Sequence, residues 1–166
     1  RPKPSVRCRR IAIRLRRPTQ PDLIQRKPFV VHHHVIASTD YIKQHGIPKS
    51  IEDLDRHKIL TYGQAPGYLT TINWLERAGR SEDNPRPVAL RVNNAYRLRR
   101  AVQAGVGIAS LADYIVAADN NLVQIDLPIE LPQFDSYFVY PEELKETKRI
   151  TAFRDFIVSK AKEWSF

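Results

Sequence analysis

Three consecutive histidines, His32, His33 and His34, are the residues of this chain that most readily suggest metal chemistry. On a β-strand His32 and His34 would share one face, as two ligands of a metal site could. A zinc or similar site needs further ligands in a defined geometry, and the sequence places no such ligands nearby. We therefore interpret the histidines as structural or solvent-facing and expect no metal.

The nucleophilic side chains and the glycines of the chain do not indicate catalysis either. Ser38, Ser110 and Cys8 lack a motif such as G-x-S-x-G that would present them, and the acidic residues show no spacing typical of a general acid and base pair. The glycines of the segment 105–107 follow a predicted helix, whereas a dinucleotide-binding loop opens one. We expect no catalytic residues, no enzyme activity and no cofactor.

Polar side chains at the ends of predicted strands suggest ligand binding instead. Asn93 and Asn94 lie between a predicted strand and a predicted helix, Tyr62 ends another strand, and Arg14 ends the first. A helix N-terminus offers backbone N–H groups to an anion, and an arginine binds a carboxylate with two hydrogen bonds. The alternatives are asparagines that only cap a helix and an arginine that belongs to a basic surface.

The elements that must position these residues alternate between strand and helix. Short β-rich segments predict strands, a buried one at 11–13 and others at 29–37, 59–62, 88–92, 108–109, 122–125 and 137–140. Capping residues predict three helices. Ser38 precedes a helix over 40–45, and Asn94 precedes a helix over 95–104. Ser50 and Asp53 form a capping box at the start of a helix over 50–57. Further helices are expected over 113–118 and 147–164, whereas 68–75 is ambiguous. This alternation predicts an α/β fold with a largely parallel sheet.

Charge and length restrict the function further. The chain has 27 Lys and Arg against 18 Asp and Glu, a formal net charge of +9, but eight of the basic residues and none of the acidic ones lie in residues 1–17. The excess therefore belongs to one end of the chain and does not by itself indicate a nucleic-acid partner. No apolar run is long enough to span a membrane, and the single cysteine favours a reducing, cytoplasmic compartment.

The ordered set of segments resembles the effector-binding region of LysR-type transcriptional regulators. The resemblance rests on matches spread from Ile11 to Trp164, namely residues 11–15, Phe29, 37–41, 45–46, Pro48, 50–54, His57, 92–94, 101–109, 113–114, 122–123, 137–141 and the helix through Phe153 and Phe156. It implies a type 2 periplasmic-binding-protein-like fold, with one complete subdomain plus the closing strand and helix of a second. In this interpretation residues 1–10 are a basic tail without a match, and residues 11–166 form a partial domain. Within that domain the second subdomain is 15–126, and the remnants of the first subdomain are 11–14 and 134–164.

The resemblance also implies a function and a site. Family effector pockets, carried onto this chain, fall on Arg14, Tyr62, Gly63, Asn93, Asn94 and Gly107. The leading hypothesis is a non-catalytic sensor that binds a small-molecule effector, such as a carboxylate or aromatic acid, between two subdomains to control transcription. We expect homodimerisation through the subdomain edge, no membrane, and no operator binding, because the family's winged helix-turn-helix is not in the chain. The alternatives are a solute-binding receptor of a transporter with the same fold, and non-specific nucleic-acid binding through the basic tail.

Overall fold

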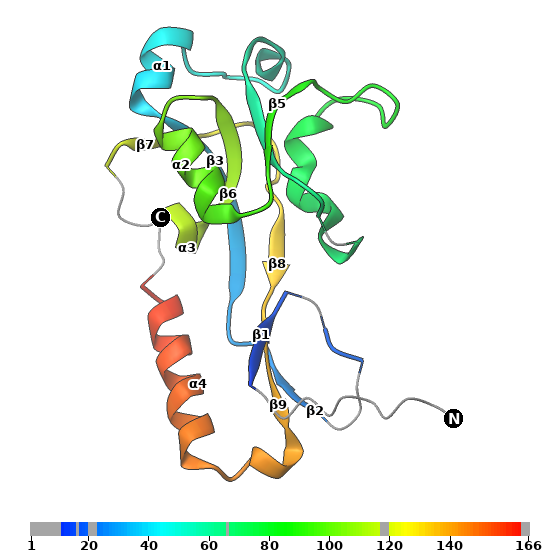
Figure 1. The fold of residues 1–166 in the computed structure, drawn as a ribbon, viewed down its shortest axis with the longest axis vertical. Helices are drawn as coiled ribbons and strands as arrows, with labels where there is room; N and C mark the ends of the chain where they lie inside the picture. The colour runs from blue at the N-terminus through cyan, green and yellow to red at the C-terminus, as the bar shows by residue number, and fades with distance from the viewer. Residues whose placement is uncertain (1–10, 16, 20–22, 66, 117–119, 164–166) are drawn as a thin grey trace. The chain divides into compact units, whose positions relative to one another are not determined.

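The computed structural model describes residues 11–15, 17–19, 23–65, 67–116 and 120–163, and these residues form two compact units (Figure 1). Unit 2 is continuous in sequence and comprises His32–Gln133, whereas unit 1 combines the described residues before His32 with those after Gln133. The break between units therefore lies at 31/32, not directly after Arg14, because residues 23–26 pair with the strand at 137–141.

The sheet of unit 2 contains both parallel and antiparallel pairs. Its strand order is β5 (Val88–Val92), β4 (Ile59–Tyr62), β6 (Ile108–Ala112), β3 (Val30–Ser38) and β7 (Leu122–Ile125), with β8 (Gln133–Asp135) also paired to β3. Strand β4 is parallel to β5 and β6, whereas β3 runs antiparallel to β6 and β7. The prediction of a largely parallel sheet is therefore wrong, because β3 begins beside the carboxyl end of β6 and runs against it.

The predicted helix caps are confirmed. The Ser38 hydroxyl accepts a hydrogen bond from the backbone N–H of Tyr41 at the start of α1 (Thr39–His45), which ends at Gly46 with a φ of 79°. Ser50 and Asp53 form the reciprocal bonds of a capping box, although the helix that they open is the 3-10 helix η1 (Glu52–Arg56). Asn94 caps α2 (Ala95–Gln103). Local side-chain chemistry thus places these three helix starts.

The core of unit 2 lies on both faces of its sheet. Ile59 packs with Leu54 and with Leu75 of the 3-10 helix η2 (Gly67–Glu76), which the sequence left ambiguous. Successive strand residues point to opposite faces, and α2 packs against β4 and β6 with Leu98 and Val102 buried. Each fully buried leucine or isoleucine contributes about 1.5–3 kcal/mol.

Unit 1 is a three-stranded antiparallel sheet with one long helix. The order is β1 (Ala12–Arg14), β9 (Tyr137–Pro141) and β2 (Leu23–Arg26), and the chain continues through η3 (Glu142–Leu144) into α4 (Lys148–Ala161). Phe138, Tyr140 and Ile150 form its core. The prediction of a buried first strand is wrong: Ile11 and Ile13 are 38% and 43% exposed, because β1 is an edge strand that pairs only with β9 in the described part of the chain.

Arg86 holds the polar loop between η2 and β5 onto unit 2. Its side chain is almost fully buried, its Nε donates to Asp55 Oδ1 at 2.6 Å, and its two terminal nitrogens donate to the carbonyls of Leu75, Ala78 and Ile51. One guanidinium therefore satisfies a carboxylate and three backbone oxygens that would otherwise lose their partners.

We expect Arg86→Met to lower the free energy of unfolding by about 3 kcal/mol or more, because it leaves three carbonyl oxygens and a carboxylate without this donor. Arg80 binds the same Asp55 from a more exposed position, so Arg80→Met is the matched control and should cost about 1 kcal/mol or less. Urea unfolding followed by circular dichroism measures both. Equal losses for the two variants would contradict the assigned role.

Candidate functional site

The parallel strands β4, β5 and β6 end at one edge of the unit 2 sheet, which we call the carboxyl edge. It comprises the residues at and after the ends of these strands: Tyr62 to Gln64 at the end of β4, Asn93 to Tyr96 at the start of α2, and Asp113 and Tyr114 at the start of α3 (Asp113–Val116). Carboxyl ends of parallel strands and helix N-termini are the usual place for ligands in α/β folds.

Asn93 joins the ends of β4 and β5. Its carbonyl accepts a hydrogen bond from the Tyr62 hydroxyl at 3.0 Å, and its side-chain oxygen accepts one from the backbone N–H of Gln64 at 3.1 Å. A Cβ at Gly63 would lie 1.7 Å from that side-chain oxygen, so the position needs glycine to let the Asn93 amide approach. The structure thus brings three of the predicted site residues into one hydrogen-bonded group.

Asn73 of η2 fixes the end of β4 from the other side. Its side-chain oxygen accepts from the backbone N–H of Tyr62 at 3.1 Å, and its side-chain nitrogen donates to the Tyr62 carbonyl at 2.8 Å. This amide takes the place of a neighbouring strand's backbone. The sequence analysis missed Asn73, because nothing local to η2 indicates that its partner lies eleven residues earlier.

Asn94 is confirmed as the cap of α2, and its side-chain oxygen accepts from the backbone N–H of Arg97 at 3.0 Å. A nine-residue helix begins with four N–H groups that have no partner inside the helix, and the cap satisfies one of them. The remaining groups and the helix dipole favour negative charge beside Asn94.

Tyrosine hydroxyls add hydrogen-bond donors to the carboxyl edge. Tyr96 is 60% exposed and Tyr114 is 38% exposed, at the first turns of α2 and α3. Burial raises the pKa of Tyr114 above its ordinary value, and Tyr96, Asp113 and Tyr62 raise it further. The phenol therefore stays protonated and able to donate at neutral pH.

Asp113 is a buried carboxylate at this edge whose oxygens accept backbone hydrogen bonds. Oδ2 accepts from the N–H of His32 at 3.1 Å, and Oδ1 accepts from the N–H of Tyr114 at 2.8 Å. It ties the first residue of unit 2 to the end of β6. Its position directly after a short strand was the signal that could have added it to the predicted site.

Gly107 lies at the other end of the strands of unit 2, and Arg14 belongs to unit 1. Gly107 precedes β6, opposite Lys58 at the amino end of β4, and a Cβ there would lie 2.2 Å from the Lys58 carbonyl oxygen. Gly107 thus lies at a close backbone approach at the other end of the strands, and its role in ligand binding stays a prediction. Arg14 ends β1 in unit 1, where it pairs with Tyr137.

The three histidines have separate environments on β3. His32 is exposed, His34 is half-buried and His33 is buried. The indole Nε1–H of Trp74 donates to Ser110 Oγ at 2.9 Å, and the same Oγ is hydrogen-bonded to His33 Nδ1 at 3.1 Å. Burial lowers the pKa of His33 from 6.5 to about 4 against the opposing effect of Asp113, so the ring is neutral at physiological pH. No group of three or more potential metal ligands occurs among the described residues.

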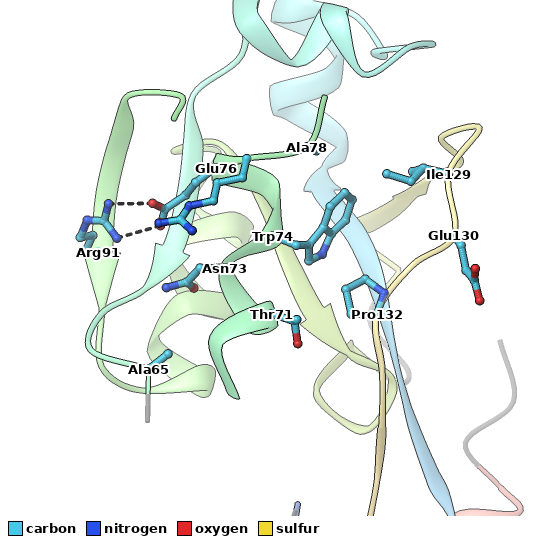
Figure 2. A pocket seen from close by; sticks show the side chains of 11 residues that line it. Ala65, Thr71, Asn73, Trp74, Glu76, Ala78, Arg91, Ile129, Glu130 and Pro132 are labelled. Atoms are coloured by element: carbon cyan, nitrogen blue, oxygen red, sulfur yellow. Dashed lines mark hydrogen bonds and ion pairs between the residues drawn. The ribbon is translucent and has the colours of Figure 1, made fainter. Parts of the chain in front are cut away.

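A cavity of about 660 Å³ lies beside Trp74, and all its lining residues belong to unit 2 (Figure 2). Trp74 and Asn73 of η2 contribute to it, together with Arg91 of β5 and with Ile129 and Pro132 from the segment after β7. The sequence analysis missed this cavity because its walls come from three segments far apart along the chain.

A model of the family described as the LysR substrate binding domain matches residues 11–162, so the chain belongs to this family. The HTH-type transcriptional regulator CrgA of Neisseria meningitidis serogroup C (strain 8013) is 31% identical over 156 residues, which cover 89% of this chain and 50% of that regulator. The chain thus spans about half the length of the curated relatives that it matches.

Solved structures agree with this assignment. The regulatory domain of CrgA from Neisseria meningitidis has a TM-score of 0.69 at 26% identity, covering 91% of this chain and 74% of that domain. The Synechocystis PCC6803 CcmR regulatory domain, solved in complex with 2-PG, has a TM-score of 0.65 at 18% identity, covering 92% and 73%, and supports the fold alone. The type 2 periplasmic-binding-protein-like fold predicted from the sequence is confirmed.

We expect Gly63→Ala to lower the free energy of unfolding by about 1–3 kcal/mol, because the new methyl group displaces the Asn93 amide. In an Asn93→Ala background the same change should cost about 1 kcal/mol or less, which urea unfolding of the double-mutant cycle measures. Gly107→Ala is the comparison, since its clash is with backbone and should persist in that background. Additive losses for Gly63→Ala and Asn93→Ala would contradict the described contact.

His33 should make the free energy of unfolding depend on pH. Its folded-state pKa of about 4 lies below the ordinary 6.5, so the unfolded chain binds more protons in that window and stability falls as the pH falls. The contribution approaches about 1.4 kcal/mol per pH unit, and His33→Gln should reduce the stability difference between about pH 6.5 and about pH 4.5, measured by urea unfolding. The exposed His32→Gln is the control, and an unchanged difference in His33→Gln would refute this role.

Proposed function

We propose that this chain is the effector-binding part of a transcriptional regulator, and that the effector is a small carboxylate or aromatic acid bound at the carboxyl edge of unit 2. Membership of the LysR substrate-binding-domain family supports the sensor role over the alternatives of a transporter receptor and a nucleic-acid-binding tail. The basic tail of that alternative, residues 1–10, lies outside the described residues.

The observation that carries this proposal is the convergence of Tyr62, Gly63, Asn93 and Asn94 on one edge, where the N-terminus of α2 opens. The first-turn N–H groups of α2 that have no partner inside the helix and do not donate to Asn94 favour an anionic group, since they need no rearrangement when it binds. The Tyr96 ring, more than half exposed beside this N-terminus, suits an aromatic portion of the ligand.

The carboxylate of Asp113 lies at the same edge, and its two oxygens accept the N–H groups of His32 and Tyr114. These bonds offset its negative charge and keep it directed at the backbone. The ligand carboxylate therefore belongs at the α2 end of the edge, beside Asn94, with the Tyr114 hydroxyl as a donor from the α3 end.

The remaining expectations from the sequence, which concern Arg14, catalysis, the protein partner and the effector, are part of this proposal. Arg14 of unit 1 is a carboxylate-binding residue, and the whole regulator acts without catalysis, as its relatives are transcriptional regulators. A second copy of the chain is the protein partner, through the edge of a subdomain. The CcmR regulatory domain, which shares this fold, was solved in complex with 2-PG, and we propose a small molecule as the effector of this chain as well. No described helix is both long and apolar enough to cross a bilayer.

A thermal-shift screen with benzoate, salicylate and succinate tests the proposal. A bound ligand stabilises the fold by RT ln(1 + [L]/Kd), about 2.7 kcal/mol at a hundredfold excess over Kd. We expect the ligand-induced shift to shrink in Asn94→Ala and in Arg14→Ala, and to persist in the exposed control Asn84→Ala. The readout is the shift on adding ligand, because loss of the α2 cap lowers the starting stability by about 1 kcal/mol.

Shifts that are equal in Asn94→Ala, Arg14→Ala and the parent chain would reject the assigned residues. No saturable stabilisation by any of the three acids would reject the ligand class.

A further inference from the structure

The cavity beside Trp74 has the size and construction of a small-molecule site. Its volume of about 660 Å³ falls within the roughly 300–1,000 Å³ of typical ligand pockets. It lies on the η2 side of the sheet, walled by η2, by β5 and by the segment after β7. The capping asparagine of α2 and the tyrosines of α2 and α3 are not among its lining residues, so it is a different site from the one proposed above.

Trp74 presents a fixed aromatic surface to this cavity. Its Nε1–H is held by Ser110 Oγ at 2.9 Å, and the ring also packs against the hydrophobic cluster of unit 2. Figure 2 shows the indole facing the side of the cavity where Ile129 and Pro132 lie. An indole already fixed by a partly buried hydrogen bond loses little entropy when a flat ring packs on it.

The polar wall of the cavity limits the charge of its ligand. Arg91 donates to Glu76 through both terminal nitrogens, at 2.7 and 2.9 Å, so each neutralises the other (Figure 2). The remaining charged lining residues are Arg77 and Glu130, one of each sign. With no net charge on the lining, a formally charged ligand would lose hydration without gaining a matching counter-charge.

We propose that this cavity is a second small-molecule site, which takes a neutral planar aromatic or heteroaromatic compound carrying a hydrogen-bonding group such as a carboxamide. The ring packs between Trp74 and the Ile129–Pro132 side. The amide bonds to the polar wall, where Thr71 and the Arg91–Glu76 pair offer donors and acceptors. This second site differs from the carboxyl edge, which favours anions, although Asn73 lines the cavity and also binds the Tyr62 backbone.

Nicotinamide and nicotinate test the proposal, because the two share a ring and differ in charge. The chain has two tryptophans, Trp74 and Trp164, so Trp164→Phe leaves a single indole signal in a ¹⁵N-labelled sample. We expect nicotinamide to shift the Trp74 indole N–H resonance saturably, with a Kd on the order of 1 mM for so small a ligand. Nicotinate should bind at least about tenfold more weakly at this resonance, by the same desolvation argument.

A substitution that fills the cavity completes the test. Thr71→Phe places a ring at an exposed position of the lining and should abolish the nicotinamide shift, whereas Thr151→Phe on α4 is a matched control that should leave it unchanged. No saturable shift with nicotinamide, equal affinity for the two compounds, or a shift that survives Thr71→Phe would each overturn the proposal.

The failure of this proposal and the failure of the proposed function are distinguishable. Asn94→Ala should leave the nicotinamide titration unchanged, and Thr71→Phe should leave stabilisation by carboxylates unchanged. If Asn94→Ala instead removes nicotinamide binding, the compound occupies the carboxyl edge, and the second site is rejected.

Discussion

The candidate site depends on the parallel pairing of β4 with β5 and β6, since this pairing makes three chain segments end at one edge. Parallel neighbours must be joined by crossovers, and each crossover back to the amino end of the sheet starts from that edge. The Asn93 amide beside Gly63 then locks two of the ends together, and Asp113 ties the third to the start of β3. Tyr62 and Asn93, which are 31 residues apart in the sequence, thus become neighbours through backbone geometry, before any ligand is considered.

The sequence predicted best those features that are encoded within a few residues. Ser38 and Asn94 were recognisable as caps because a helix start needs a short polar side chain at that position. Strand ends at Tyr62 and Asn93 followed from β-rich segments, and both lie at the predicted edge. The direction of β3, the exposure of Ile11 and Ile13, and the displaced position of Gly107 were not predictable in this way, because they depend on which strand lies beside which.

The cavity beside Trp74 illustrates the same limit for function. A lone tryptophan in an ambiguous segment carries no signal for a site, and only the folded chain shows that Ser110 holds its indole and that Ile129 and Pro132 lie nearby. Unit 2 therefore contains two environments of opposite character. The carboxyl edge combines a helix N-terminus with phenol hydroxyls, whereas the cavity combines an aromatic face with charges that cancel.

The division of unit 1 between the two ends of its sequence has a consequence for biosynthesis. In the described part of the chain β1 and β2 pair only with β9, which begins at Tyr137, more than a hundred residues later. During synthesis β1 and β2 emerge before unit 2, whereas the strand β9 with which they pair emerges after it. Unit 2, continuous from His32 to Gln133, can close its core during that interval. Unit 1 is therefore completed only after unit 2 has been made, and its long-range pairing with β9 is slow compared with the formation of local contacts.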